Sequence, residues 1–181
     1  MKRFCLCVLL LLSLLLSGCG VKKEEKQLSD FSASLSSRND LGFVGKLRCE
    51  YDDRSVKFTL QYKQTDDGCK IVVLQPEELE GIAVNLDQNG SVLEYGDLFL
   101  NTGELDRFGL SPLNALPMLV NTLESAHIDS VRSEGGQTVY SLIPADDIQV
   151  DVSFNENMVP VYAEFISEGK VRVFCEIESW R

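Results

Sequence analysis

Short runs of alternating apolar and polar residues, separated by turn residues, make up most of the chain after Phe43. In the first run, Phe43, Leu47 and Cys49 alternate with Lys46 and Arg48. A period of two places apolar side chains on one face of a β-strand and polar side chains on the other. Strands of this kind are predicted at 43–51, 56–62, 69–74, 82–86, 92–95, 139–143, 148–154, 161–165 and 171–177, and residues 98–100 add a short strand. The chain therefore predicts a large antiparallel sheet, of about nine to eleven strands, with one apolar face.

Two segments, 27–39 and 111–123, carry the three- and four-residue spacing of amphipathic helices instead. Pro117 inside the second segment predicts a break in that helix, or a late start near Asn114. A sheet with one apolar face needs a covering layer, and these helices are the candidates for it. We therefore expect an α+β fold, in which helices cover the concave face of a large curved antiparallel sheet (a half-open β-barrel).

The N-terminus has the three-part layout of a secretory signal peptide. Lys2 and Arg3 give it a basic start, an apolar run follows at 4–16, and small residues precede Cys19. The apolar run is shorter than the roughly 20 residues that a membrane-spanning helix needs. Residues 16–19, Leu-Ser-Gly-Cys, resemble the lipobox of bacterial lipoproteins, with ordinary signal cleavage as the alternative.

The lipobox resemblance implies that Cys19 is alkylated by a diacylglycerol and becomes the first residue of the mature protein. Two acyl chains anchor a protein to a membrane stably. We therefore expect a signal peptide at 1–18, the lipidated cysteine with a short solvated tether at 19–27, and a single domain at 28–181. The expected location is the cell membrane, with the domain at its extracytoplasmic face.

The acidic composition argues against nucleic-acid binding, and the sequence lacks recognisable catalytic and metal-binding motifs. A formal net charge of −11 argues against nucleic acid as a partner and against an anionic bilayer bound through the body of the protein. The only histidine, His127, has no nucleophile-elbow pattern beside it. The aspartate pairs at 52–53, 66–67 and 146–147 lie in predicted turns, where Asp bonds to the backbone. We therefore predict a non-catalytic protein without a cofactor or a metal.

Three cysteines, Cys49, Cys69 and Cys175, remain after the anchor, and each lies on the apolar phase of a predicted strand. This placement favours buried thiols, which behave as small apolar side chains. One disulfide with one free thiol is the alternative, and Cys49 and Cys69 are the pair closest in sequence. A metal site is not expected, because no two of these cysteines have a short ligand spacing.

Three stretches resemble a known family. They are Leu74-Gln75-Pro76-Glu77-Glu78-Leu79-Glu80-Gly81, the hairpin Asn89-Gly90-Ser91-Val92-Leu93-Glu94-Tyr95, and the final hairpin from Pro160-Val161-Tyr162 to Glu168-Gly169-Lys170-Val171-Arg172-Val173. Together with the order of elements, they resemble the LolA/LolB-like lipoprotein carrier fold. Within it, they are similar to Firmicute lipoproteins related to the germination lipoprotein GerS. The resemblance spans about residues 28–181 and rests on turn and packing signals.

The resemblance implies two functions. The first is binding of lipid or lipoprotein acyl chains in the hollow of the sheet, lined by Leu47, Phe58, Leu60 and Val73, although ordinary core packing explains these residues equally well. The alternative is a protein-interaction lipoprotein, GerS-like, that supports a cell-wall amidase during spore cortex modification in sporulation or germination. A continuous apolar cavity would favour lipid binding, and a filled concave face would favour the interaction role.

Overall fold

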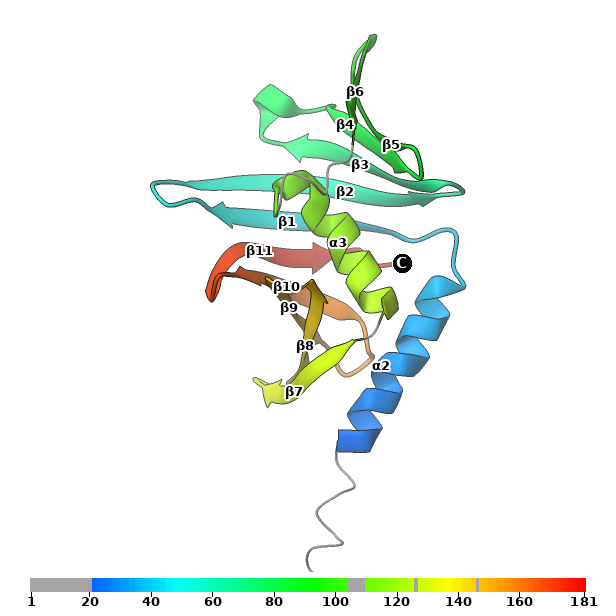
Figure 1. Ribbon diagram of the computed structural model, residues 1–181, viewed down its shortest axis with the longest axis vertical. Coiled ribbons are helices and arrows are strands. Elements are labelled where there is room, and N and C mark those ends of the chain that lie inside the picture. Colours follow the sequence, from blue (N-terminus) through cyan, green and yellow to red (C-terminus); the bar gives the residue numbers. More distant parts are fainter. Residues whose placement is uncertain (1–20, 104–109, 126, 146) are drawn as a thin grey trace, which may run out of the picture.

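The computed structural model describes residues 21–103, 110–125, 127–145 and 147–181 (Figure 1). Its helices are α2 (Val21–Ser36), the short 3₁₀ helix η1 (Glu77–Leu79) and α3 (Pro112–Ser125). Its strands are β1 (Gly42–Glu50), β2 (Ser55–Thr65), β3 (Gly68–Gln75), β4 (Ala83–Asp87), β5 (Gly90–Tyr95), β6 (Leu98–Gly103), β7 (Ile128–Glu134), β8 (Gln137–Ala145), β9 (Ile148–Phe154), β10 (Pro160–Ser167) and β11 (Lys170–Glu178).

These strands form one 11-stranded sheet in the order β6-β5-β4-β3-β2-β1-β11-β10-β9-β8-β7. Neighbouring strands are antiparallel throughout, and strands that follow one another in each half of the chain pair directly. The two halves meet where β1 pairs with β11, for example at Leu47 and Cys175. The sheet therefore consists of two meanders, β1–β6 and β7–β11, and its open edges are β6 and β7.

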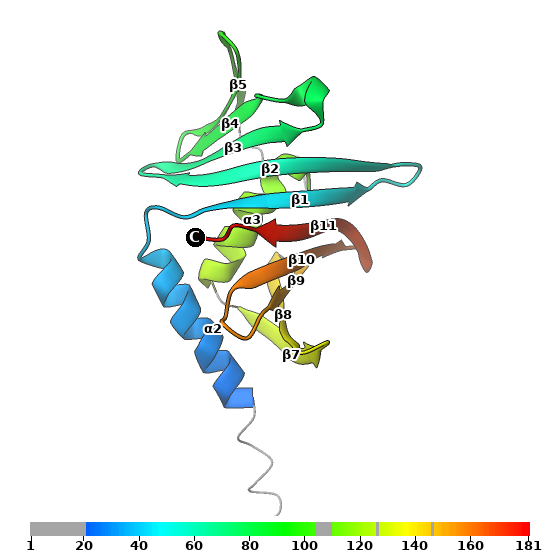
Figure 2. The ribbon, with the colours of Figure 1, turned by 180° about the vertical axis from the view of Figure 1, so that it is seen from behind.

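Both α-helices lie on one side of this curved sheet. Figure 1 shows α3 in front of β1 and β2, and Figure 2, from behind, shows those strands in front of α3. The core between the layers contains the apolar side of the strands together with one face of each helix; its largest fully buried side chains are Tyr140, Phe154, Phe165, Leu28, Leu41, Leu47, Leu60, Ile71, Leu116, Leu119, Leu123 and Leu142. The predicted α+β architecture, a half-open β-barrel with helices on its concave face, is confirmed.

The N-terminus of α3 is fixed by a reciprocal cap. The Asn114 amide donates to the Ser111 hydroxyl at 3.3 Å, and the Ser111 amide donates to the Asn114 side-chain oxygen at 2.7 Å. Pro112 occupies the first helical position, where its missing N–H costs nothing. The predicted break at Pro117 is wrong, because the helix runs through this residue to Ser125. Burial of the apolar face of α3 outweighs the one backbone hydrogen bond that Pro117 removes.

Helix α2 starts earlier than the sequence predicts. It begins at Val21 rather than Gln27, so the segment expected to be a short solvated tether is helical from Val21 onward. Hydrogen bonds help to hold α2 in place: the Ser32 hydroxyl lies within hydrogen-bond distance of the backbone carbonyls of Leu123 and, at 3.1 Å, Glu124, and the Tyr140 hydroxyl donates to that of Glu24 at 3.1 Å. These bonds tie α2 to both α3 and the sheet.

One strand was not predicted at all. The segment of β7, Ile-Asp-Ser-Val-Arg-Ser-Glu, lacks a regular alternation, yet it pairs with β8 from Ile128 to Glu134. Only Ile128 and Val131 of this strand are half-buried, and the other residues are exposed. A mostly exposed edge strand has no buried face to impose a period of two on the sequence, which explains the missing signal.

Candidate functional site

The concave face is filled at the place where the sequence predicted a lipid-lined hollow. Leu47, Leu60 and Val73 are buried in the main core, and Phe58 is half-buried at its margin. The face they share is covered by α3, whose Leu116 side chain approaches β1 at Gly45. The structure thus brings the four residues together as packed core, and a role for them in lipid binding stays a prediction.

The predicted anchor, Cys19, and the predicted signal peptide at 1–18 lie outside the described residues. The described chain starts with α2 at Val21, two positions after this cysteine. Within the described residues, no helix has the length and apolar character needed to cross a membrane.

The remaining cysteines are buried free thiols, as their apolar phase predicted. Burial raises the pKa of the Cys49 thiol to about 11, that of Cys69 to about 11 and that of Cys175 to about 12. The thiolate is the reactive form of cysteine, so all three side chains are held in their unreactive form at neutral pH.

The edge strand β6 exposes several large apolar side chains to solvent. Leu98, Phe99 and Leu100 are 71%, 68% and 61% exposed, and Tyr95, on the paired strand β5, is also exposed. Adjacent residues of a strand point to opposite faces, so β6 exposes apolar side chains on both faces. No described strand pairs with the outer side of β6. We call Tyr95, Leu98, Phe99 and Leu100 the apolar edge.

The apolar edge continues the core of the protein into solvent. A row of directly paired residues crosses four strands, from Ile71 through Val84 and Leu93 to Leu100. Exposure rises along this row from 0% at Ile71 and 1% at Val84 to 61% at Leu100. Helix α3 makes its main contacts with the sheet at β1, β2 and β8. The apolar row therefore extends from the buried core to the exposed edge strand.

The surroundings of the apolar edge are acidic. Residues 71–103 contain no Lys, Arg or His, and their carboxylates are Glu77, Glu78, Glu80, Asp87, Glu94 and Asp97. Lys70, just before this segment, pairs with Glu94 at 2.8 Å and lowers the pKa of that carboxyl through this hydrogen bond. Among the described residues, the other five carboxylates have no ion-pair partner within 4.0 Å.

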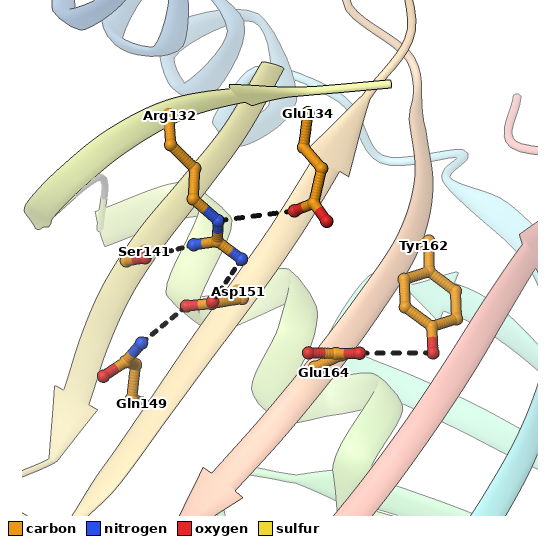
Figure 3. A network of polar contacts seen from close by, with 7 residues as sticks. All are labelled: Arg132, Glu134, Ser141, Gln149, Asp151, Tyr162 and Glu164. Carbon is orange, nitrogen blue, oxygen red and sulfur yellow. Dashed lines mark hydrogen bonds and ion pairs between the residues drawn. The ribbon is translucent and has the colours of Figure 1, made fainter. Parts of the chain in front are cut away.

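The convex face near the other edge carries a polar network (Figure 3). Arg132 of β7 pairs with Asp151 of β9 at 2.8 Å and donates to the Ser141 hydroxyl of β8 at 3.1 Å. The Asp151 side chain is only 8% exposed and also accepts a hydrogen bond from Gln149 at 2.7 Å. These groups satisfy one another across three strands, so the network ties the β7 edge to the sheet.

Two open grooves cross this convex face, with volumes of about 510 Å³ and about 860 Å³. Tyr162 lines both, and its hydroxyl donates to Glu164 at 3.4 Å (Figure 3). In the larger groove the Arg48 guanidinium lies 3.8 Å from the centre of the Phe174 ring. Cationic and anionic side chains line both grooves, so neither has a lining of one charge that would select a ligand.

A third groove, of about 950 Å³, runs beside α3. Pro117, Met118 and Val120 of the helix line one side, and Leu86 and Ile148 of the strands contribute to the others. None of the four residues predicted to line a lipid site borders this groove. Burial raises the pKa of Glu124, which also lines it.

No catalytic or metal-binding constellation is found in the described part of the chain. Groups of three or more His, Cys, Asp or Glu side chains that could hold a metal ion are lacking among the described residues. His127 is exposed. Asp52 accepts a hydrogen bond from Arg172 at 3.2 Å in the turn between β1 and β2, which is a structural role.

Sequence reasoning missed the apolar edge as a surface, although a signal for it exists. Leu98, Phe99 and Leu100 are three consecutive apolar residues next to a Gly-Asp turn, rather than an alternating run. A strand with this sequence has apolar side chains on both faces, and an edge strand cannot bury both.

Solved structures with a similar fold exist. An uncharacterised conserved protein from Thermus thermophilus is 10% identical, with a TM-score of 0.52 over 86% of this chain and 85% of that chain. A LolA superfamily protein from Nitrosomonas europaea is 13% identical, with a TM-score of 0.41 over 80% and 86%. A chain in the complex of the CwlD amidase with the GerS lipoprotein from Clostridioides difficile is 19% identical, with a TM-score of 0.41 over 84% and 91%.

These likenesses concern the fold alone, because the identities are low. No protein-family model matches the sequence, and no curated protein matches it. Of the three structures, the Thermus thermophilus protein has a TM-score above 0.5, and it supports a shared fold only.

Proposed function

We propose that the chain is a lipoprotein at the extracytoplasmic face of the cell membrane, anchored through Cys19, and that it binds a partner protein without catalysing a reaction. The observation that carries this proposal is the apolar edge, with Leu98, Phe99 and Leu100 exposed on a strand whose outer side pairs with no other described strand. Contiguous apolar side chains on the surface of a folded protein mark sites of association. The filled concave face agrees with an interaction role rather than a carrier role.

The position of the apolar edge suits a partner that lies away from the anchor. Figure 1 shows the β5–β6 hairpin at one end of the long axis and the start of α2 at the other. With Cys19 directly before α2, the anchor holds the α2 end at the membrane. The apolar edge then points outward, toward proteins of the surrounding compartment.

A cell-wall amidase is the partner that the sequence resemblance implies. The chain is similar in sequence to Firmicute lipoproteins related to GerS, and the Clostridioides difficile structure contains GerS together with the CwlD amidase. We therefore propose that the chain supports such an enzyme during sporulation or germination.

Site-specific photo-crosslinking tests this proposal. A photoreactive amino acid replaces Phe99 in the full-length lipidated protein, produced in sporulating cells, and a second variant carries it at Ser133 on the exposed β7 edge as the control. We expect a protein adduct from position 99 that is absent from position 133, with a cell-wall amidase identified in it by mass spectrometry. Adducts with lipid alone, or the same adducts from both positions, would overturn the binding role. A position-99 adduct that contains no cell-wall enzyme would overturn the choice of partner.

Binding of acyl chains is a second candidate function, favoured by the groove beside α3. Its volume of about 950 Å³ is in the range of ligand pockets, and Met118, Val120 and Ile148 give it apolar walls. Native mass spectrometry of the protein purified without detergent tests this function. A preparation that carries no lipid beyond its own anchor, and takes up no fatty acid, would contradict it.

A further inference from the structure

We infer that the partner docks by adding a β-strand to β6, and that this strand alternates apolar residues with Lys or Arg. The inference rests on the proposed binding function and specifies how the partner is recognised. It follows from three properties of this end of the sheet: an unfinished apolar row, an open backbone edge and an unbalanced negative charge.

The apolar row from Ile71 to Leu100 has a vacant next position. Each member of the row faces its neighbour on the adjacent strand, and Leu100 is the last. A strand placed beside β6 would put a side chain next to Leu100, and its residue two positions away would lie next to Leu98. An apolar residue at each of these positions would extend the buried face by one strand.

The backbone of β6 is available for such pairing. Edge strands are commonly protected by Lys, Pro or bulges, and β6 contains neither Lys nor Pro. The register shift between β5 and β6 occurs at Ser91 and Val92, which pair with Gly103 and Asn101 at the far end of the strand. The stretch from Leu98 to Leu100 is therefore regular, and its outward N–H and C=O groups pair with no strand of the described chain, which is the requirement for strand addition.

The negative charge around β6 favours Lys or Arg at the polar positions of the added strand. Residues 71–103 hold only carboxylates as charged groups, and Lys70 neutralises just Glu94 among them. A second copy of this chain would bring an equally acidic segment against the first, with a net charge of −11 on each molecule. Basic side chains on the partner, in the positions next to Phe99, would meet Asp97 in the turn between β5 and β6 instead. A basic strand is thus favoured over a second copy.

Selection from a random library of displayed linear peptides, against the detergent-solubilised full-length protein, tests the inference. We expect the enriched peptides to alternate apolar residues with Lys or Arg. Their affinity should fall at least about tenfold for the double variant Leu98→Ser/Leu100→Ser. It should stay within about twofold for Ile143→Ser, which removes another exposed aliphatic side chain, 44% exposed, from β8. Hydrogen exchange with the best peptide bound should show slower exchange at amides 98–102.

Several results would overturn the inference. They are peptides without the alternation or without basic residues, failure to enrich any peptide, or protection that appears only outside β6. A wild-type homodimer in sedimentation experiments that disappears in the double variant would make a second copy the occupant and would overturn it too. If the adduct from position 99 forms while the peptide results fail, strand addition is wrong and the binding role stands. If that adduct does not form, the proposed function itself fails.

Discussion

The two open edges of the sheet, β6 and β7, expose opposite kinds of side chain. The β7 edge exposes Asp129, Arg132 and Glu134, and α2 packs against this strand. The β6 edge exposes Leu98, Phe99 and Leu100. Exposed charges and a covering helix are common means of preventing an edge from pairing with other chains. Among the described residues only β7 has them, which favours β6 as the edge suited to association.

The helical cover divides the concave face in the same way. Helix α3 packs on β1, β2 and β8, whereas the row from Ile71 to Leu100 passes from full burial to exposure within four strands. Apolar side chains therefore stabilise the fold where they are buried under α3, and they contribute little to stability at the exposed strand β6.

Matched leucine substitutions at a buried and an exposed position of this face should give the largest difference. Leu60→Ala removes a fully buried side chain and should lower the free energy of unfolding by about 2–5 kcal/mol. Leu100→Ala, on the same face of the sheet, should change it by less than about 0.5 kcal/mol. Urea unfolding followed by the fluorescence of Trp180 measures both, since this single tryptophan packs against Phe43 with ring centres 4.7 Å apart. Equal losses would show that the apolar edge is covered in solution.

The packing of α3 against β1 should depend on the small size of Gly45. A Cβ atom on Gly45 would lie 2.7 Å from the Leu116 side chain of α3 and 3.2 Å from the Cys175 sulfur. Gly45→Val should therefore destabilise the protein by about 1–3 kcal/mol through overpacking. Gly42→Val on the same strand is the control, because a Cβ there meets its nearest atom at an ordinary 3.7 Å. An equal effect of the two substitutions would contradict the close contact between α3 and β1.

The sequence predicted the parts of this fold in which one side of a strand is buried. Alternation located β1 and β2, because burial of Phe43 and Leu60 imposes a period of two. It also predicted the burial of the three cysteines after the anchor. It missed β7, whose exposure leaves the sequence free of that period.

The exposure of the apolar edge could not be predicted from the alternation of residues. Leu98 and Leu100 look like core residues in sequence, and their exposure depends on the place of β6 at the end of the strand order. That order follows from pairing between strands such as β1 and β11, which are distant in sequence. Pro117 misled the prediction of α3 similarly, because the buried apolar face of the helix outweighs a local signal.

The charged edge should be stabilised by its polar network. Arg132→Met leaves the Asp151 carboxylate without its cation. The Asp151 side chain is only 8% exposed, so water cannot replace that cation well. We expect a loss of about 1–3 kcal/mol, the cost of removing a hydrogen bond to a buried charged group. Glu134→Gln removes only the exposed partner, 3.6 Å from Arg132, and should cost less than about 0.5 kcal/mol. Urea unfolding at neutral pH compares the two, and a smaller loss for Arg132→Met than for Glu134→Gln would contradict the structural role of the network.

The smallest effect should come from two carboxylates whose pKa values shift in opposite directions. Near the open edge, the hydrogen bond from Lys70 lowers the pKa of Glu94 below its usual value of 4.5. Its stabilising contribution is therefore present above about pH 4.5 and is lost as the pH falls through the folded-state pKa. On α3, burial raises the pKa of Glu124, so its contribution is present below about pH 4.5 and is lost as the pH rises through the folded-state pKa.

Substitution by glutamine should separate these two contributions. Glu94→Gln should make the protein less sensitive to acid, because the group that loses its ion pair on protonation is absent. Glu124→Gln should raise stability at neutral pH relative to acid, because no buried carboxylate then has to ionise. Urea midpoints measured from about pH 3 to about pH 7 give both slopes. If both variants changed the pH dependence of the urea midpoint in the same direction, one of the two pKa shifts would be wrong. Either Lys70 would not lower the pKa of Glu94, or burial would not raise the pKa of Glu124.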